Sequence, residues 1–388
     1  MSATRGPALP VLWLCGPPGV GKSTVAWHTF RAHARSGTRT AYADIDQLGI
    51  CFPEPPDDPD RHRLKARNLR AVLAAARAAG ARRAVVSGVV DPAHGPHMAE
   101  LAGTAPAVVR LRADRAELER RFLGRGDPPH SLAEVLAEAD VYDRGTFADA
   151  TVDTTALHVT EVVRRVRASA SAHLARPATA PPPTPRSGPR PGPAPGGPVL
   201  WLSGTRGTGK SAVGWEVFQT LLRAGVAAAF IDLEQIGFLS PAPADDPGNL
   251  RLGARNLAAL WTTYRAAGAQ ALVVVGTDGS APAVAHITAA LPEARFTLRR
   301  LHAGPDRITQ RVFLRGAGHG PALPGDPLRG KPEPYLARAA RRARAEAAAR
   351  ERTGPPVPRV RTDDHSAAET ARMILAVTGW PGPGLLTG

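Results

Sequence analysis

The chain has 388 residues, which is two to three times the usual domain length and predicts more than one domain. Hydrophobic residues make up 43% of it, which excludes a disordered chain, and aromatic residues only 5%, which indicates aliphatic cores. The formal net charge is +15, so a nucleic-acid partner is one alternative. Arginine supplies nearly all of that charge, and no basic strip is interleaved with aromatics, so we favour a small-molecule partner.

The first half of the chain alternates between strand and helix patterns. The apolar run at residues 10–15 predicts a strand that is covered on both faces. Further strands are predicted at 40–43, 84–87, 107–111 and from 151 onward, and helices at 23–34, 63–79, 116–123 and 159–168. This alternation predicts an α/β fold with a doubly wound parallel sheet flanked by helices.

The same pattern returns 188 residues later. Residues 11–14, Val-Leu-Trp-Leu, recur at 199–202, and residues 66–69 recur as 254–257 with one conserved offset. We therefore predict a tandem duplication of one domain. The expected boundaries are a first domain at 1–175, a Pro/Gly-rich linker at 176–198, a second domain at 199–380 and a flexible tail at 381–388.

The strongest motif follows the first predicted strand and precedes the first predicted helix. It is a Gly-x4-Gly-Lys-Ser phosphate loop, in which glycines let backbone N–H groups converge on phosphate oxygens. Its candidate nucleotide-binding residues are Gly16, Pro17, Pro18, Gly19, Val20, Gly21, Lys22, Ser23 and Thr24. Lys22 would bridge the β- and γ-phosphates of ATP, and Ser23 would bind Mg²⁺. The alternative, a glycine-rich turn that binds nothing, does not explain this placement between strand and helix.

The second half repeats the motif in the same context. Its candidate nucleotide-binding residues are Gly204, Thr205, Arg206, Gly207, Thr208, Gly209, Lys210, Ser211 and Ala212. Ala212 replaces Thr24, whose hydroxyl can reach the α-phosphate. We expect the first copy to be the catalytic one and the second to be impaired or specialised.

Two carboxylates follow the second predicted strand. Asp44 and Asp46 are two residues apart, and alternation along an extended strand end would aim both toward the ligand side of the sheet. Asp44 is the candidate Mg²⁺ ligand, and Asp46 is the candidate base for an acceptor hydroxyl. The second copy has Asp232, a further candidate metal ligand, and Glu234. The alternative is that the two carboxylates cap a turn.

The third strand lacks the terminal aspartate of switch-type NTPases. It ends in Ser87-Gly88, and its counterpart ends in Val275-Gly276. This absence argues against a motor or a GTPase-like switch. Glycine there allows another segment to approach the backbone closely.

Arginines at the end of the helix predicted at 116–123 are candidates for contacting the transferred phosphoryl group. Arg121 and Arg125 could neutralise charge that develops during transfer, and Arg311 and Arg315 match them in the second copy. The alternative is a solvated helix face. The Arg67-Asn68 pair could be a substrate clamp or a helix-packing pair.

At these motifs the chain resembles the nucleoside-monophosphate-kinase-like branch of P-loop proteins, with shikimate, gluconate and adenylylsulfate kinases and chloramphenicol phosphotransferase. The resemblance implies two P-loop NTPase domains, Mg²⁺ support by Asp44 and an acceptor hydroxyl held by Asp46. It also implies that the region of Asp153 contacts adenine. The glycine triplet of shikimate kinase is absent after Ser87, which weakens that substrate.

These observations predict a small-molecule kinase that uses ATP and Mg²⁺ to phosphorylate a hydroxyl acceptor. The alternatives are a non-catalytic or regulatory nucleotide-binding ATPase and a nucleic-acid end kinase. Two cysteines, Cys15 and Cys51, fit a reducing compartment, and no apolar run approaches the length of a membrane span. We expect a cytoplasmic protein without a membrane partner; acceptor and oligomeric state are not determined by the sequence.

Overall fold

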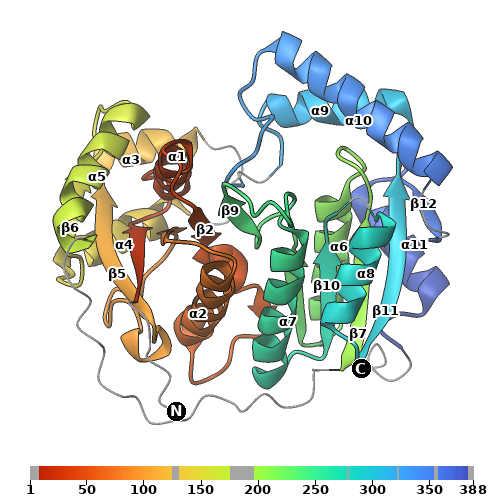
Figure 1. The fold of residues 1–388 in the computed structure, drawn as a ribbon, viewed down its shortest axis with the longest axis horizontal. Helices are drawn as coiled ribbons and strands as arrows, with labels where there is room; N and C mark the ends of the chain where they lie inside the picture. The colour runs from red at the N-terminus through yellow and green to blue at the C-terminus, as the bar shows by residue number, and fades with distance from the viewer. Residues whose placement is uncertain are drawn as a thin grey trace. The chain divides into compact units, whose positions relative to one another are not determined.

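The chain forms two compact units in a computed structural model (Figure 1). The structure describes residues 8–124, 131–174, 196–277, 279–320, 323–353 and 357–382. Of these residues, unit 1 contains those up to Gly49, those from Asp60 to Leu174, and Phe238–Leu252. Unit 2 contains Ile50–Pro59, the residues from Gly196 to Gly237, and those from Gly253 onward. Most of the expected linker at 176–198 and of the tail at 381–388 lies outside the described residues, so the linear domain boundaries stay a prediction.

Unit 1 contains a six-stranded sheet in the order β6-β5-β1-β4-β2-β9. Every neighbouring pair is parallel except β2 and β9. Its strands are β1 (Leu9–Cys15), β2 (Thr40–Asp44), β4 (Arg83–Ser87), β5 (Thr104–Arg112), β6 (Ala150–Asp153) and β9 (Phe238–Ser240). Its α-helices are α1 (Lys22–Arg35), α2 (His62–Ala78), α3 (Arg115–Leu123), α4 (Leu132–Arg144) and α5 (Val159–Leu174). Short 3-10 helices are η1 (Ile45–Leu48), η2 (Pro59–Arg61) and η3 (Met98–Glu100).

Unit 2 repeats this arrangement with the order β12-β11-β7-β10-β8-β3, again parallel except at the last pair. Its strands are β3 (Cys51–Phe52), β7 (Gly197–Ser203), β8 (Ala228–Asp232), β10 (Ala271–Val275), β11 (Ala294–His302) and β12 (Arg359–Arg361). Its helices are α6 (Lys210–Arg223), α7 (Leu250–Ala266), α8 (Ala281–Ala290), α9 (Pro305–Gly316), α10 (Glu333–Thr353) and α11 (Ala367–Thr378). The predicted parallel α/β fold, with helices flanking each sheet, is confirmed for both units.

The antiparallel edge strand of each sheet comes from the other half of the sequence. β9 pairs with β2 in unit 1, with Tyr42 opposite Phe238, and β3 pairs with β8 in unit 2, with Cys51 opposite Ala229. The sequence pattern did not predict either strand. Both are two or three residues long and run directly into Pro53 or Pro241, which reads as the end of a strand rather than as a strand.

The central strand of unit 1 is covered on both faces, as its apolar run predicted. Val11, Leu14 and their neighbours in β1 are almost fully buried. The main hydrophobic core on one face is built from α1 and α5 packed against each other and against β1, β4 and β5. Because β1, β4 and β2 are consecutive and parallel in the sheet, their carboxyl ends lie next to one another at one edge of the sheet.

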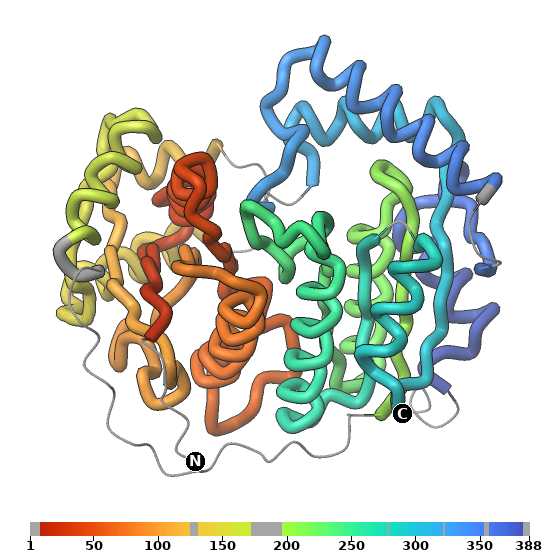
Figure 2. Tube along the Cα trace, in the orientation of Figure 1, coloured from red at the N-terminus to blue at the C-terminus, as the bar shows by residue number. Residues whose placement is uncertain are grey.

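The helices after β5 in unit 1 differ from those after β11 in unit 2. In unit 1, α4 begins with a capping box formed by Ser131 and Glu134. In unit 2 the longer, arginine-rich α10 lies along α9, held by an apolar cluster that includes Val312 and Leu336 (Figure 2). Within the described part of the chain, no helix is long and apolar enough to cross a membrane.

Candidate functional site

The predicted phosphate loop of unit 1 connects β1 to α1 and requires glycine at both ends. Gly16 has φ 137°, and a Cβ there would lie 2.3 Å from the carbonyl oxygen of Leu111. Gly21, with φ 100°, is the N-cap of α1. Unit 2 has the same construction, because a Cβ on Gly204 would lie 2.5 Å from the Leu301 carbonyl oxygen. Only residues without a Cβ fit such a turn.

The lysine that ends each loop is folded back over it. Lys22 Nζ donates to the carbonyl oxygens of Gly16 at 2.7 Å and Pro17 at 3.1 Å. Burial lowers the pKa of Lys22, while the nearby Asp46, Glu138 and Asp44 carboxylates oppose that shift. A lysine ammonium held at a glycine loop is the type of group that a phosphate site uses.

The residue after the lysine contacts the first predicted acid. Ser23 Oγ donates to Asp44 Oδ2 at 3.0 Å, and Asp44 is 5% exposed. Burial and the neighbouring Asp46 raise the pKa of Asp44 to about 6, although hydrogen bonds from Ser87, Ser23 and the Asp46 N–H act in the opposite direction. The hydroxyl and the carboxylate therefore form one polar cluster at the start of α1.

Unit 2 reproduces this contact. Ser211 Oγ donates to Asp232 Oδ2 at 3.0 Å. Burial and the nearby Glu234 raise the pKa of Asp232 to about 6. The two predicted hydroxyl–carboxylate pairs are thus brought together in both units with the same spacing.

The second acid does not lie on an extended strand, so the expected alternation is wrong. β2 ends at Asp44, and Ile45–Leu48 form a 3-10 helix that Asp44 caps by accepting the N–H of Asp46 at 3.1 Å. The turn-capping alternative therefore describes the backbone correctly. The Asp46 side chain is nevertheless 46% exposed and faces the same site, with Lys65 Nζ 3.8 Å from its Oδ1.

The glycine after the third strand allows the close approach that was expected there. A Cβ on Gly88 would lie 2.6 Å from Ile45 Cγ2 and 3.1 Å from Asp46 Oδ2. In unit 2 a Cβ on Gly276 would lie 3.0 Å from Leu233 Cβ. The segment that approaches is the turn carrying the second acid, so these glycines make room for Asp46 and Glu234.

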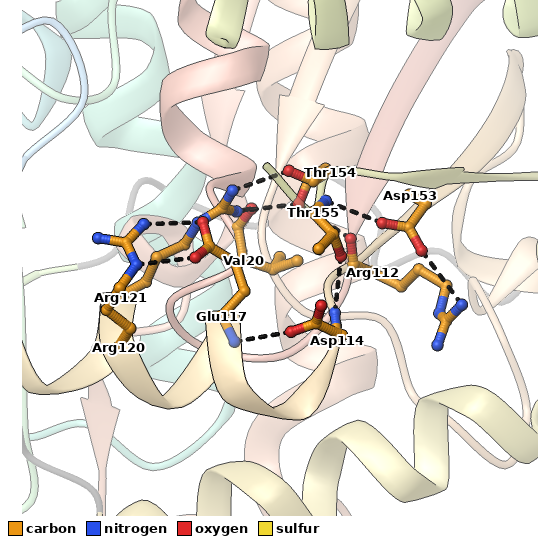
Figure 3. A network of polar contacts seen from close by, with 9 residues as sticks. All are labelled: Val20, Arg112, Asp114, Glu117, Arg120, Arg121, Asp153, Thr154 and Thr155. Carbon is orange, nitrogen blue, oxygen red and sulfur yellow. Dashed lines mark hydrogen bonds and ion pairs between the residues drawn. The ribbon is translucent and has the colours of Figure 1, made fainter. Parts of the chain in front are cut away.

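Arg121 lies between the phosphate loop and the segment after β6 (Figure 3). Its guanidinium donates to Val20 O at 3.3 Å, to Thr154 Oγ1 at 2.9 Å and to Thr154 O at 2.8 Å, and Glu117 accepts from its Nε at 2.7 Å. Arg120, the preceding residue, instead has a side chain 71% exposed. A solvated helix face therefore describes Arg120 and not Arg121.

Arg311 makes the matching contacts in unit 2. It donates to Gly207 O at 3.1 Å, to Thr362 Oγ1 at 2.8 Å and to Thr362 O at 2.7 Å. Each unit thus has one arginine that joins the phosphate loop to a threonine following the last strand. Thr154 lies in the region that was expected near adenine, whereas Thr362 was not among the predicted site residues. The signal for Thr362 was its place directly after the closing strand, which it shares with Thr154.

Of the two other predicted arginines, the structure describes only Arg315. Arg125 lies outside the described residues. Arg315 forms an ion pair with Asp326 and donates to the His319 carbonyl, so its contacts are within the connection that follows α9.

Asp153, predicted near adenine, is held at the end of β6. It accepts the Thr155 N–H at 2.8 Å and pairs with Arg112 at 3.2 Å. These hydrogen bonds and the arginine keep the pKa of Asp153 below its usual value, although burial opposes them.

The open question about residues 67 and 68 is settled for the asparagine. Asn68 is fully buried, and its Nδ2 donates to Leu48 O at 2.6 Å, as Asn256 Nδ2 does to Ile236 O. The asparagine is a packing residue that joins the second helix to the turn after Asp46 or Glu234. Arg67 lies apart from it and pairs with Glu100 at 3.0 Å on the surface.

Lys65 is a site residue that sequence reasoning missed. Its side chain is 9% exposed, and its stem lies against Gly49, where a Cβ would be 2.6 Å from Lys65 Cγ. The available signal was that it is one of few lysines in an arginine-rich chain. At the corresponding place unit 2 has Gly253.

The polar groups at this site are suited to a hard cation. Ser23 and Asp44 supply oxygen atoms only, and among the residues that the structure describes no group of three or more His, Cys, Asp or Glu could hold a metal ion. Mg²⁺ characteristically uses one or two protein oxygens and completes its shell with water and substrate phosphates. The residues present therefore fit Mg²⁺ bound together with a nucleotide.

No protein-family model and no curated protein matches the chain. Among matching solved structures, the tunicamycin resistance protein of Deinococcus radiodurans is 22% identical, with a TM-score of 0.33, over 42% of this chain and 96% of that chain. A gluconokinase from Sinorhizobium meliloti is 22% identical, with a TM-score of 0.30, over 42% of this chain and 91% of that chain. The APS kinase of Mycobacterium tuberculosis, in complex with AMPPNP and APS, is 20% identical, with a TM-score of 0.30, over 47% of this chain and 98% of that chain. Each of these three alignments spans less than half of this chain.

Proposed function

We propose that unit 1 is an ATP- and Mg²⁺-dependent phosphotransferase that transfers the γ-phosphoryl group to a hydroxyl of a small molecule. The observation that carries this proposal is the contact between Ser23 Oγ and Asp44 Oδ2 at the end of a glycine loop, with Lys22 and Asp46 beside it. This arrangement combines a phosphate cradle, oxygen ligands for a hard cation and a second, accessible carboxylate.

Each residue has a defined task in the proposed reaction. Backbone N–H groups of the loop and Lys22 hold the β- and γ-phosphates. Ser23 and Asp44 would hold Mg²⁺, which when bound neutralises charge on the phosphates. The acceptor oxygen bonds to the γ-phosphorus, the bond to the β–γ bridging oxygen breaks and ADP leaves. Asp46 accepts the proton of the acceptor hydroxyl.

Support for Asp46 as the base comes from its exposure and its surroundings. Its carboxylate is 46% exposed, whereas Asp44 is buried under Ser23 and Ser87. Only the exposed carboxylate can meet an acceptor that enters from solvent. Lys65, 3.8 Å from Asp46, adds a buried ammonium beside the place where the acceptor would lie.

We propose that unit 2, arising from a tandem duplication, holds nucleotide through residues 204–211 but transfers phosphoryl poorly. Lys210 Nζ lies 3.5 Å from Glu234 Oε1, so the longer acid engages the loop lysine itself. Gly253 replaces Lys65, and Ala212 replaces Thr24. These differences favour a scaffold or sensor role for unit 2, in line with the regulatory alternative for the whole protein.

The proposal includes a cytoplasmic location and a small-molecule acceptor, with a nucleic-acid end kinase as the alternative that the charge favours. The test is ADP release by the full chain against a panel of sugars, acids, nucleosides, antibiotics and oligonucleotides. We expect one class of hydroxyl compound to stimulate release. ATP binding without any stimulation would support the regulatory alternative, and stimulation by oligonucleotides that falls steeply with salt would support the end kinase. Absence of ATP binding would overturn all three.

A further inference from the structure

A chain of buried hydroxyls reaches Asp44 from the side opposite the phosphate loop. The Tyr42 and Ser87 hydroxyl oxygens are 2.8 Å apart, and Ser87 Oγ donates to Asp44 Oδ2 at 2.9 Å. Ser87 has one hydroxyl proton and gives it to the carboxylate, so Tyr42 must be the donor to Ser87. Tyr42 is 1% exposed and Ser87 0%, so this directed chain is shielded from water.

Asp44 accepts hydrogen bonds from Ser23, from the Asp46 N–H and from Ser87. Of these three donors, Ser87 is the one that lies on a neighbouring strand. Its place is fixed by the sheet, since Ser87 at the end of β4 lies opposite Asp44 at the end of β2. Ser23 instead belongs to α1 and is the hydroxyl that a bound cation would engage. A carboxylate anchored by Ser87 keeps its orientation whatever Ser23 does.

Tyr42 is itself held by an aromatic cage. Trp27 meets its ring edge-on with centroids 5.3 Å apart, and Phe238 does so at 5.5 Å. Trp27 and Phe238 also contact each other at 5.1 Å. Phe238 lies on β9, whose register places it opposite Tyr42, although it is 196 residues further along the chain. A residue from the C-terminal half of the sequence thus fixes the ring that begins the hydroxyl chain in unit 1.

Unit 2 has the same backbone frame without this chain. Phe230 takes the place of Tyr42, and Val275, opposite Asp232 in the register, takes the place of Ser87. The residue that accepts the Phe230 N–H is Ile50, which directly precedes β3. Asp232 still accepts from Ser211 and from the Glu234 N–H. The hydroxyl chain therefore distinguishes unit 1 while the loop-side contacts are shared.

We propose that Ser87 and Tyr42 are positioning residues that orient the Asp44 carboxylate, and that Phe238 holds the Tyr42 ring in place. Through Phe238, a residue from the C-terminal half of the sequence then contributes to the cation site of unit 1. This inference rests on the proposed function. Residues that orient a metal-bound carboxylate through a hydrogen bond change metal affinity or activity by about 10–100-fold when they are replaced. The effect belongs to the cation and not to the nucleotide phosphates, which the loop holds.

The test uses the full chain with Lys210→Ala, so that binding reports on unit 1. The variants carry the residues of unit 2: Ser87→Val, Tyr42→Phe and Phe238→Ile. A fluorescent ATP analogue is titrated in EDTA and then at increasing Mg²⁺. We expect Ser87→Val to raise the half-saturating Mg²⁺ concentration about 10–100-fold while affinity in EDTA stays unchanged. Ser87→Thr, which restores the hydroxyl, should return the Mg²⁺ response to that of the parent.

Tyr42→Phe and Phe238→Ile should shift the Mg²⁺ response in the same direction, and the double variant should shift it less than the sum of the two, because they act through one ring. Val275→Ala is the control for a volume change at the matched place in unit 2. An unchanged Mg²⁺ response in Ser87→Val would overturn the positioning role while leaving ATP binding, and so the proposed function, in place. A shift with Tyr42→Phe but none with Phe238→Ile would remove the contribution of the C-terminal half.

If Ser87→Val does not fold, as judged by thermal melting, Ser87→Ala and Ser87→Thr take its place as the pair without and with the hydroxyl. Equal Mg²⁺ responses in that pair would overturn the proposal, and a shift in Ser87→Ala alone would support it. Loss of analogue binding by the parent in EDTA and Mg²⁺ alike would instead overturn the proposed function.

Discussion

Units 1 and 2 share a backbone frame, and they differ in the polar side chains placed on it. In both, a serine donates to a buried aspartate at 3.0 Å and an arginine joins the phosphate loop to a threonine. Around that shared core, unit 1 has Asp46 beside Lys65, whereas in unit 2 Glu234 reaches the loop lysine. The proposed nucleotide-binding residues thus have the same contacts in both units, while the residues on the proposed acceptor side differ.

The comparison shows how one methylene can redirect a carboxylate. Asp46 and Glu234 both follow a capped turn, and each backbone N–H donates to the preceding aspartate. Both lysines donate to carbonyl oxygens of their own loop, but Lys210 Nζ also lies 3.5 Å from the carboxylate of the longer Glu234. A carboxylate on the loop lysine competes with phosphate for the same cation.

Removal of the proposed base should produce the largest difference between the units. Asp46→Asn keeps the shape but cannot accept the hydroxyl proton, so we expect acceptor phosphorylation to fall about 10²–10⁴-fold while ATP still binds. Glu234→Gln is the matched control and should leave turnover unchanged. Parent-like turnover in Asp46→Asn would move the base to another group.

The loop lysines should separate the units almost as strongly. Lys22→Ala removes the cation from the phosphates of unit 1, and losing one such charge-stabilising donor costs about 10²–10³-fold in turnover. Lys210→Ala should change acceptor-dependent turnover little. Equal losses, or a larger loss from Lys210→Ala, would show that the catalytic role was assigned to the wrong unit.

The residue after the loop serine should produce a smaller difference. Thr24→Ala gives unit 1 the residue of unit 2, and losing a hydrogen bond to a charged oxygen costs roughly 1.5–3 kcal/mol, or about one to two decades of affinity. Ala212→Thr is the reciprocal gain in unit 2. Calorimetry with ATP, in chains whose other loop carries the lysine-to-alanine change, measures both; no loss in Thr24→Ala would show that its hydroxyl does not reach the nucleotide.

The smallest expected effect tests the Glu234 contact. Glu234→Asp should withdraw the carboxylate from Lys210 and strengthen nucleotide binding to unit 2 by up to about fivefold, because a half-exposed ion pair is worth at most about 1 kcal/mol. Asp46→Glu is the converse change and should weaken binding to unit 1. Nucleotide titration in the Lys22→Ala and Lys210→Ala backgrounds respectively separates the two. Unchanged affinities in both would mean that the ion pair does not compete with phosphate.

Local sequence determined much of this molecule because its signals act over a few residues. Glycines at 16 and 21, Lys22 and Ser23 follow an apolar strand directly, and the turn they form depends on backbone conformations that neighbouring residues set. The alternation of short apolar strand patterns with helix patterns likewise predicted the parallel sheets. The shared offset of 188 residues identifies the corresponding residues of the second half from the sequence.

The side-chain contacts and strand pairs between residues far apart in the sequence became known only from the tertiary structure. Arg121 could have faced solvent until Val20 and Thr154 were brought to it, and Asn68 could have been a clamp until the carbonyl of Leu48 lay against it. The two edge strands could not be predicted from the sequence for the same reason, because two or three residues next to a proline show no strand pattern of their own. Phe238 becomes part of unit 1 only because β2 has unpaired backbone N–H and C=O groups with which β9 can pair. Local sequence specified the two glycine loops, because their turns depend on adjacent residues. Long-range strand pairing specified which distant residues pack beside them, because those partners are far away in the sequence.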